Sequence, residues 1–100
     1  MKKKEISHVV GPYMNYRNTD FCGFKFNGNL EGTNFDGSDL SSCIFGDDTT
    51  LTNCSFNNVI IDSAFISNNS TKFDIITLED RSEYYKLCHL IPKETNRKIK

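Results

Sequence analysis

The chain has 100 residues and a formal net charge of −1 at pH 7. This length fits a single domain with a modest hydrophobic core. No apolar stretch approaches the ~20 residues that a membrane-spanning helix needs. Polar residues follow the lysines at positions 2–4 so closely that the apolar segment of a signal peptide is interrupted. The sequence therefore argues against a membrane protein, and we expect a cytoplasmic location.

Residues 1–18 are expected to form a cap segment at one end of the domain. A Gly11-Pro12 turn signal divides this segment. Apolar residues on both sides of the turn can cover the open end of a repeat, as terminal caps do in repeat proteins. These residues are Ile6, Val9, Val10, Tyr13, Met14 and Tyr16.

Between residues 19 and 77 a large apolar residue returns at almost every fifth position. Neither a helix, with a period of about 3.6 residues, nor a strand, with a period of about 2, gives this spacing. A fixed internal period instead indicates a solenoid, in which each short unit packs against its neighbours. Two positions before the large residues stand mostly small ones: Gly28, Thr33, Ser38, Cys43, Thr49, Cys54, Val59 and Ala64.

Written as units, this part of the chain reads GNLEG, TNFDG, SDLSS, CIFGD, TTLTN, CSFNN, VIIDS and AFISN. The units resemble the pentapeptide-repeat family, in which a small residue is followed by Asp or Asn, Leu or Phe, and two polar residues. The resemblance covers roughly residues 19–76. It implies a right-handed quadrilateral β-helix, with four units to a coil and four faces around a dry core.

The predicted fold class is thus an all-β solenoid, a right-handed quadrilateral β-helix of about three coils with an N-terminal cap and a C-terminal α-helix. Residues one coil apart should lie above one another. A second register for the last coil, centred on Phe65, Phe73 and Leu78, stays open. The expected columns are Phe21, Leu40, Ile61; Phe26, Phe45, Ile66; Leu30, Leu51, Thr71; and Phe35, Phe56, Ile76.

Residues 78–91 are predicted to form one amphipathic helix, and residues 92–100 a basic tail. Thr77 and Asp80 resemble a capping box, and Pro92 marks the end of the helix. The apolar face of the helix comprises Tyr84, Leu87, Cys88 and Ile91. Two roles stay open for this helix, an end cap for the solenoid and a homodimer contact.

The sequence offers no constellation for catalysis, metal binding or cofactor binding. The only histidines, His8 and His89, are not at ligand spacing from a cysteine or a carboxylate. No glycine-rich phosphate loop is present, and no serine or cysteine has an evident base. The four cysteines lack paired spacing, which indicates reduced thiols. We therefore expect a protein that is not an enzyme and has no cofactor.

The repeat is acidic while both ends are basic. Residues 19–76 carry eight acidic residues against two lysines, whereas residues 1–18 and 77–100 each have a net positive charge. One interpretation is a solvated, soluble surface. The other is an anionic surface that resembles nucleic-acid phosphate and fits a basic groove. Its predicted residues are Asp20, Asp39, Asp62, Asp47, Asp48, Asp36 and Glu31.

A second predicted surface is apolar. Large side chains at outward positions of the last coil, together with the helix face, are expected either to be covered by the C-terminal segment or to form a partner or dimer interface. The residues are Ile60, Phe65, Phe73, Ile75, Tyr84, Leu87, Cys88 and Ile91.

The resemblance extends to function. The pentapeptide-repeat family includes fluoroquinolone-resistance proteins, which bind DNA gyrase as acidic mimics of DNA. The main hypothesis is an inhibitor or modulator that presents an acidic surface to a DNA- or RNA-handling protein, such as a topoisomerase, a nuclease or a bacterial defence complex. The alternative is an adapter or effector-type scaffold that binds through the apolar last coil and the C-terminal helix. Direct binding of nucleic acid or membrane is not expected. The composition, rich in Lys, Asn and Ile, suits a low-GC bacterium or its phage.

Overall fold

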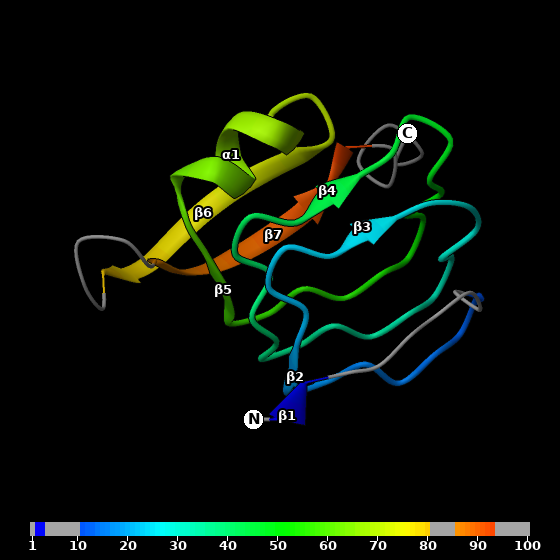
Figure 1. Ribbon diagram of the computed structural model, residues 1–100, viewed down its shortest axis with the longest axis horizontal. Helices are drawn as coiled ribbons and strands as arrows, with labels where there is room; N and C mark the ends of the chain where they lie inside the picture. The colour runs from blue at the N-terminus through cyan, green and yellow to red at the C-terminus, as the bar shows by residue number, and fades with distance from the viewer. Residues whose placement is uncertain (1, 4–10, 81–85, 94–100) are drawn as a thin grey trace.

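A computed structural model describes the structure of residues 2–3, 11–80 and 86–93. Short strands dominate it, with one helix near the middle of the chain (Figure 1). The elements are β1 (Lys2–Lys3), β2 (Thr19–Asp20), β3 (Lys25–Phe26), β4 (Ile44–Phe45), β5 (Val59–Ile61), α1 (Ser63–Asn69), β6 (Phe73–Asp80) and β7 (Lys86–Pro92).

Residues 19 to 21 positions apart lie side by side between residues 15 and 60. Strand β3 pairs in parallel with β4, joining Phe26 to Phe45. Strand β1 pairs in parallel with β2. Isolated parallel bridges continue the pairing at Asn15–Asn34–Ser55, Asp20–Asp39–Ile60 and Asn29–Thr50.

Aromatic rings fill the space that these segments surround. The rings of Phe35 and Phe56 stack with centroids 4.9 Å apart and planes 4° from parallel. Phe26 and Phe45 stack in the same way at 4.7 Å. All four side chains are buried, and burial of each stabilises the fold by about 1.5–3 kcal/mol. The inward positions predicted from Phe21 through Ile61 are buried as expected.

The chain changes direction at residues with a left-handed backbone. Asn58 has a φ of 57° and Ser42 a φ of 61°, a region that L-residues other than Asn, Asp and Gly rarely adopt. Each of these residues stands two positions after a buried large residue. The corners of this kind are Asn18, Gly23, Gly28, Gly32, Gly37, Ser42, Asn53 and Asn58.

The small residues inside the fold also donate hydrogen bonds. The Cys43 thiol donates to the carbonyl oxygen of Phe21 at 3.0 Å, and the Thr49 hydroxyl donates to that of Phe26 at 3.1 Å. Thr33, Ser38 and Cys54 make the same contact to Gly11, Tyr16 and Leu30. This position therefore favours a small side chain that carries a donor, which adds a hydrogen bond to carbonyls that in part already accept one from the backbone, as Phe21 does from the Phe24 N–H.

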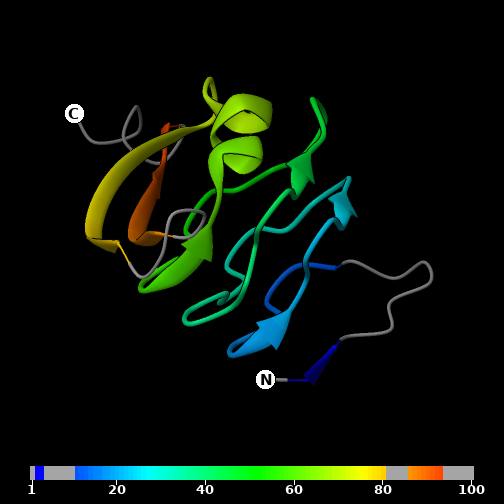
Figure 2. The same ribbon diagram turned by 60° about the vertical axis from the view of Figure 1, so that its left-hand side comes forward.

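The predicted C-terminal helix at residues 78–91 is wrong. Residues on both sides of the undescribed segment 81–85 form the antiparallel strands β6 and β7. They join β5 in a three-stranded sheet with the order β5-β7-β6 (Figure 2). The spacing of Leu87, Cys88 and Ile91 fits a helix, but the burial of Cys88, Leu90 and Pro92 follows the alternation of a strand.

Helix α1 occupies the place expected for part of a third coil. The Asp62 carboxylate caps this helix by accepting a hydrogen bond from the Phe65 N–H at 2.9 Å. At the other end, the buried Asn69 amide reaches back to β4. It accepts from the Phe45 N–H and donates to the Cys43 carbonyl, both at 2.9 Å. A side chain thus satisfies the backbone edge that another strand would otherwise pair.

The predicted fold class is wrong. The chain is a compact α/β globule with short strands in sheets of two, two and three, and with no continuous β-helix in the described residues. Its radius of gyration, 12.4 Å, is near the ~13 Å of a compact domain of this length. The regular spacing fails at the Asp62 cap. Beyond it Ile66 lies in α1, and Thr71 and Ile76 are exposed, so a third coil does not form.

Both predicted terminal segments extend beyond the described residues. The predicted cap at residues 1–18 lies partly, and the tail at residues 92–100 mostly, outside the described residues. Within the described part of the chain, no helix combines the length and apolar character needed to cross a bilayer.

Candidate protein-binding surface

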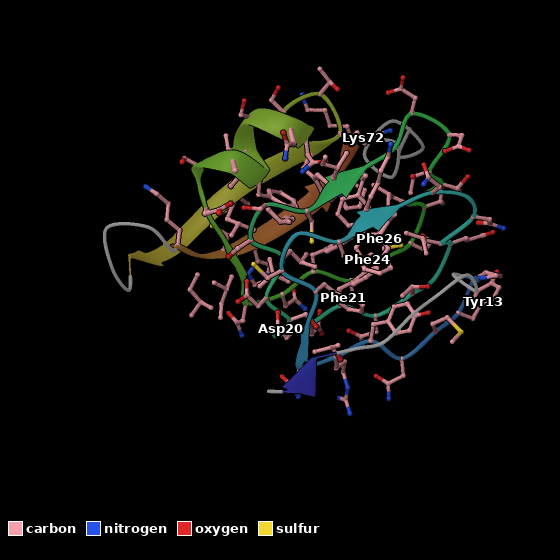
Figure 3. The ribbon with its side chains drawn as sticks, in the orientation of Figure 1. Tyr13, Asp20, Phe21, Phe24, Phe26 and Lys72 are labelled. Atoms are coloured by element: carbon pink, nitrogen blue, oxygen red, sulfur yellow. The ribbon has the colours of Figure 1, made fainter. Side chains whose placement is uncertain are left out.

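Two carboxylates predicted to stack are neighbours in the structure. Asp20 and Asp39 are partners in a parallel bridge, and Asp20 lies at the end of β2 (Figure 3). The Oδ1 atom of each accepts a hydrogen bond from the backbone N–H two residues later, at 2.9 Å. Among the described residues, the second oxygen of each carboxylate has no hydrogen-bond or ion-pair partner. The chain thus holds each side chain through one carboxylate oxygen and leaves the other oxygen available.

The negative charge at these positions is not needed for the turn. Asn15, Asn29 and Asn34 occupy equivalent places, and each accepts the same hydrogen bond from the N–H two residues later. An amide oxygen therefore meets the local structural requirement as well as a carboxylate does. Like charges directly opposite each other on neighbouring strands are destabilising. Strand β1 places Lys3 opposite Asp20 on its other side, whereas the turn at Asp39 gains nothing from the charge that an asparagine would not supply.

The carboxylate pair continues into apolar residues. Asp39 is bridged to Ile60, and Ile60 pairs with Leu87 of β7. Residues directly opposite each other in a sheet present their side chains on the same face. We call the residues Asp20, Asp39, Ile60 and Leu87 the outer row. It joins two charged positions to two apolar ones on one side of the molecule.

The outer row borders an apolar area on the C-terminal sheet. Cys88 and Leu90 of β7 are buried, so the alternate residues Leu87, His89 and Ile91 lie on the opposite face. Ile76 is opposite His89 and is 51% exposed. The Nδ1 atom of His89 is buried and has no hydrogen-bond partner among the described residues. Ile76 and His89 were not predicted as site residues, although the alternation around Cys88 and Leu90 would have indicated His89.

Asp62, expected near this acidic cluster, has a structural role. Its carboxylate accepts hydrogen bonds from the N–H and hydroxyl of Ser42, at 2.8 and 2.9 Å, besides capping α1 at Phe65. Partial burial raises the pKa of Asp62, but the hydrogen bonds from Phe65 and Ser42 outweigh it and hold the pKa below its ordinary value. This side chain has little capacity left for a partner.

The other predicted acids are not brought to the outer row. The Asp36 carboxylate accepts hydrogen bonds from the Ser55 hydroxyl at 2.6 Å and the Asn57 N–H at 2.8 Å. Asp47 and Asp48 are exposed in the loop after β4, away from β2 (Figure 1). Glu31 is half-buried. The predicted acidic surface therefore reduces to the Asp20–Asp39 pair, with separate charges elsewhere.

The predicted apolar surface divides in two. Phe65, Phe73 and Cys88 are buried in the core, and Ile75 packs against that core. Ile60, Leu87 and Ile91 lie on the outer side of the sheet, half-buried. Tyr84 lies outside the described residues.

Cys43, one of the buried cysteines in the described residues, is not activated as a nucleophile. Burial strongly raises the pKa of the Cys43 thiol, and the nearby Cys22, Asp39 and Asp62 raise it further, against a backbone hydrogen bond at Phe24. A thiol of this kind is a poor nucleophile at neutral pH. In residues 2–3, 11–80 and 86–93, no three His, Cys, Asp or Glu side chains gather as a metal site.

Comparisons with protein-family models, with curated proteins and with solved structures found no match for this chain.

Proposed function

We propose that this chain is a non-enzymatic binding protein that engages a partner protein through the outer row. The observation that supports this proposal is the charge at Asp20 and Asp39. Asn15, Asn29 and Asn34 make the same turn without a charge, so the paired carboxylates serve something other than the turn. Their continuation into Ile60 and Leu87 combines a charged rim with an apolar centre, as protein interfaces do.

The partner that fits the outer row has a basic surface. Adjacent strands, and so the backbones that carry the two carboxylates, are about 4.8 Å apart, and successive phosphates on one DNA strand are separated by ~3.4 Å along the axis. A groove that accepts a phosphate backbone therefore offers cationic side chains on a similar scale. We place the partner among DNA- or RNA-handling proteins, with this chain as an inhibitor or modulator that competes with nucleic acid.

The experiment compares two double variants that each remove two negative charges. Asp20→Asn/Asp39→Asn keeps an acceptor for the turn, as at Asn34, and removes the charge from the outer row. Asp47→Asn/Asp48→Asn removes the same charge from the exposed loop after β4. Immobilised wild type and both variants are incubated with a bacterial extract, and retained proteins are identified by mass spectrometry.

We expect a protein retained by wild type and by Asp47→Asn/Asp48→Asn to be lost with Asp20→Asn/Asp39→Asn. Duplex DNA added to the wild-type column should displace it, and added salt should weaken retention, because charge pairs are screened. Equal thermal stability of the three proteins is the folding control. Equal retention of the partner by wild type and by Asp20→Asn/Asp39→Asn would contradict the proposal.

The apolar area next to the outer row favours a second candidate function. In that case the protein is an adapter that recruits its partner by hydrophobic contact. The observation that favours it is the exposure of Ile76, whose side chain is 51% exposed and lies opposite His89 on the outer side of the sheet. In that case Ile76→Ser should weaken retention of the partner strongly. Asp20→Asn/Asp39→Asn, duplex DNA and salt should then have little effect, which separates the two candidates.

A further inference from the structure

Strand β6 has one edge that no described residue pairs. In the sheet β5-β7-β6 it contacts β7 on one side only. Figure 2 shows β6 at the margin of the molecule, with α1 on the side toward β4. An unpaired strand edge carries free N–H and C=O groups that can pair with another chain.

The pairing with β7 fixes which groups lie on this edge. The Lys93 N–H donates to the Lys72 carbonyl at 2.9 Å. Hydrogen-bonded and non-hydrogen-bonded pairs alternate along an antiparallel ladder. The backbone groups of Asp74 and Ile76 therefore face β7, and those of Phe73, Ile75 and Thr77 face the open edge. The regular stretch ends at Thr77, because a register shift follows between Thr77 and Glu79.

Within residues 73–77 this edge has little protection, because the bulge lies beyond Thr77. Natural edge strands are blunted by lysine, proline or a bulge, but residues 73–77 read FDIIT. Ile75 and Ile76 are β-branched residues that favour a strand, and Ile76 is 51% exposed. Asp74 is the only charged residue in the stretch.

Charge selects a second copy of this chain as the occupant. The strand begins beside two cations, Lys72 and Lys93, which are joined through their backbones. It ends with two acidic residues, Glu79 and Asp80; Lys86 of β7 lies opposite Asp80, whereas Leu87 lies opposite Glu79. Antiparallel pairing of two identical strands places the basic start of each next to the acidic end of the other. Pairing centred on Ile75 also places Asp74 opposite Ile76 of the second copy, so no carboxylate directly faces another.

We propose that this protein forms a two-fold symmetric dimer in which β6 pairs antiparallel with β6 of a second copy, centred on Ile75. Phe73 pairs with Thr77 of the second copy and Ile75 with Ile75, and each such pair exchanges two backbone hydrogen bonds. The two three-stranded sheets become one continuous sheet. Ile75, which packs against the core, meets its copy and extends the core across the axis. The same patch is used by both subunits, as in most homodimers.

The test uses two variants at one exposed position. Ile76→Asp places a carboxylate opposite Asp74 of the second copy, and Ile76→Lys places an ammonium group there. Either charge is tolerated in the monomer, because the side chain is 51% exposed. Sedimentation velocity of the full chain over a wide concentration range measures self-association. We expect a dimer for wild type and Ile76→Lys, and self-association about tenfold weaker for Ile76→Asp.

A second measurement tests the register. Wild-type protein and its ¹⁵N-labelled form are mixed and treated with a carbodiimide, which links adjacent amines and carboxylates directly. Mixed-isotope peptides that join Lys72 or Lys93 to Glu79 or Asp80 support the proposal. A monomer at all concentrations, equal effects of Ile76→Asp and Ile76→Lys, or intermolecular links elsewhere would each overturn it. The dimer does not depend on the outer row, so its failure leaves the proposed function untouched.

Discussion

The Asn69 side chain and the Phe45 backbone are hydrogen-bonded as two strands would be. The Asn69 Oδ1 accepts from the Phe45 N–H at 2.9 Å, while its Nδ2 donates to the carbonyls of Cys43 and Phe65, each at 2.9 Å. Asn69 is 1% exposed. One amide group therefore closes the edge of β4 and ties α1 to it.

Asn69→Leu should destabilise the protein by roughly 2–4 kcal/mol. The variant leaves the Phe45 N–H and the Cys43 carbonyl buried with their main partner removed, and each such group costs about 1–3 kcal/mol. Urea unfolding followed by circular dichroism measures the free energy of unfolding. The control is Asn68→Ala, which removes only a 3.4 Å contact to Cys43 from an exposed side chain. An Asn69→Leu variant as stable as Asn68→Ala would refute the role assigned to the amide.

Asp62 should make the stability of the fold fall in acid. Its pKa is lowered in the folded state by hydrogen bonds from Phe65 and Ser42 that exceed the effect of burial. A carboxylate of this kind stabilises the fold above its unfolded pKa of about 4, and the contribution is lost as pH falls through the folded value. Asp62→Asn keeps an N-cap but loses the charge-assisted hydrogen bonds, so it should be less stable than wild type at pH 7, and the difference should shrink below about pH 4. Thermal unfolding of both proteins between neutral and acidic pH tests this; a difference that is constant with pH would contradict it.

The two neighbouring thiols Cys22 and Cys43 should differ sharply in reactivity. Cys22 is exposed, whereas Cys43 is buried, has a raised pKa and donates to the Phe21 carbonyl. Iodoacetamide at neutral pH should label Cys22 rapidly and Cys43 only after denaturation, because the thiolate is the reactive form. Peptide mass spectrometry of native and urea-treated protein gives both rates. Equal native rates would mean that the core around Cys43 opens readily.

The corner at Asn58 should tolerate glycine better than any branched residue. Asn58 is exposed and has a φ of 57°. Asn58→Gly should be neutral or slightly stabilising, while Asn58→Val should destabilise by roughly 1–3 kcal/mol, because a β-branched residue is strained in this conformation. Asn57→Val is the matched control, since Asn57 is also exposed and has no positive φ. Similar losses at both positions would show that the conformation is not responsible.

The spacing of large residues was a good guide to burial up to Ile61 and a poor one beyond it. Phe35 and Phe56 stack because the chain returns to the same side of the fold after 21 residues. The spacing of large residues in the sequence is enough to predict this return. Asp62 interrupts it as a helix cap, a role that depends on contacts with Ser42 as well as on local sequence. The segment around Leu87 satisfies both helical and alternating patterns, and its pairing with Ile60 decided in favour of a strand.

The candidate site was predictable in part for the same reason. Asp20 and Asp39 are 19 residues apart, and the repeat indicated that they are neighbours. The repeat could not indicate that the carboxylates of Asp62 and Asp36 accept hydrogen bonds from other residues of the fold. It also could not place Ile76 beside His89, because that contact depends on the antiparallel register of β6 and β7.

The thiols that support this fold also expose it to oxidants. Cys43 and Cys54 each donate to a carbonyl oxygen 3.0 Å away, in the place where Thr33 and Ser38 use a hydroxyl. Conversion of either thiol to a sulfinic acid replaces the donor with a larger anionic group, in a space sized for one small side chain. Peroxide that reaches these residues during transient opening would therefore trap the opened chain, and a Cys43→Ser/Cys54→Ser protein should survive exposures that inactivate the parent.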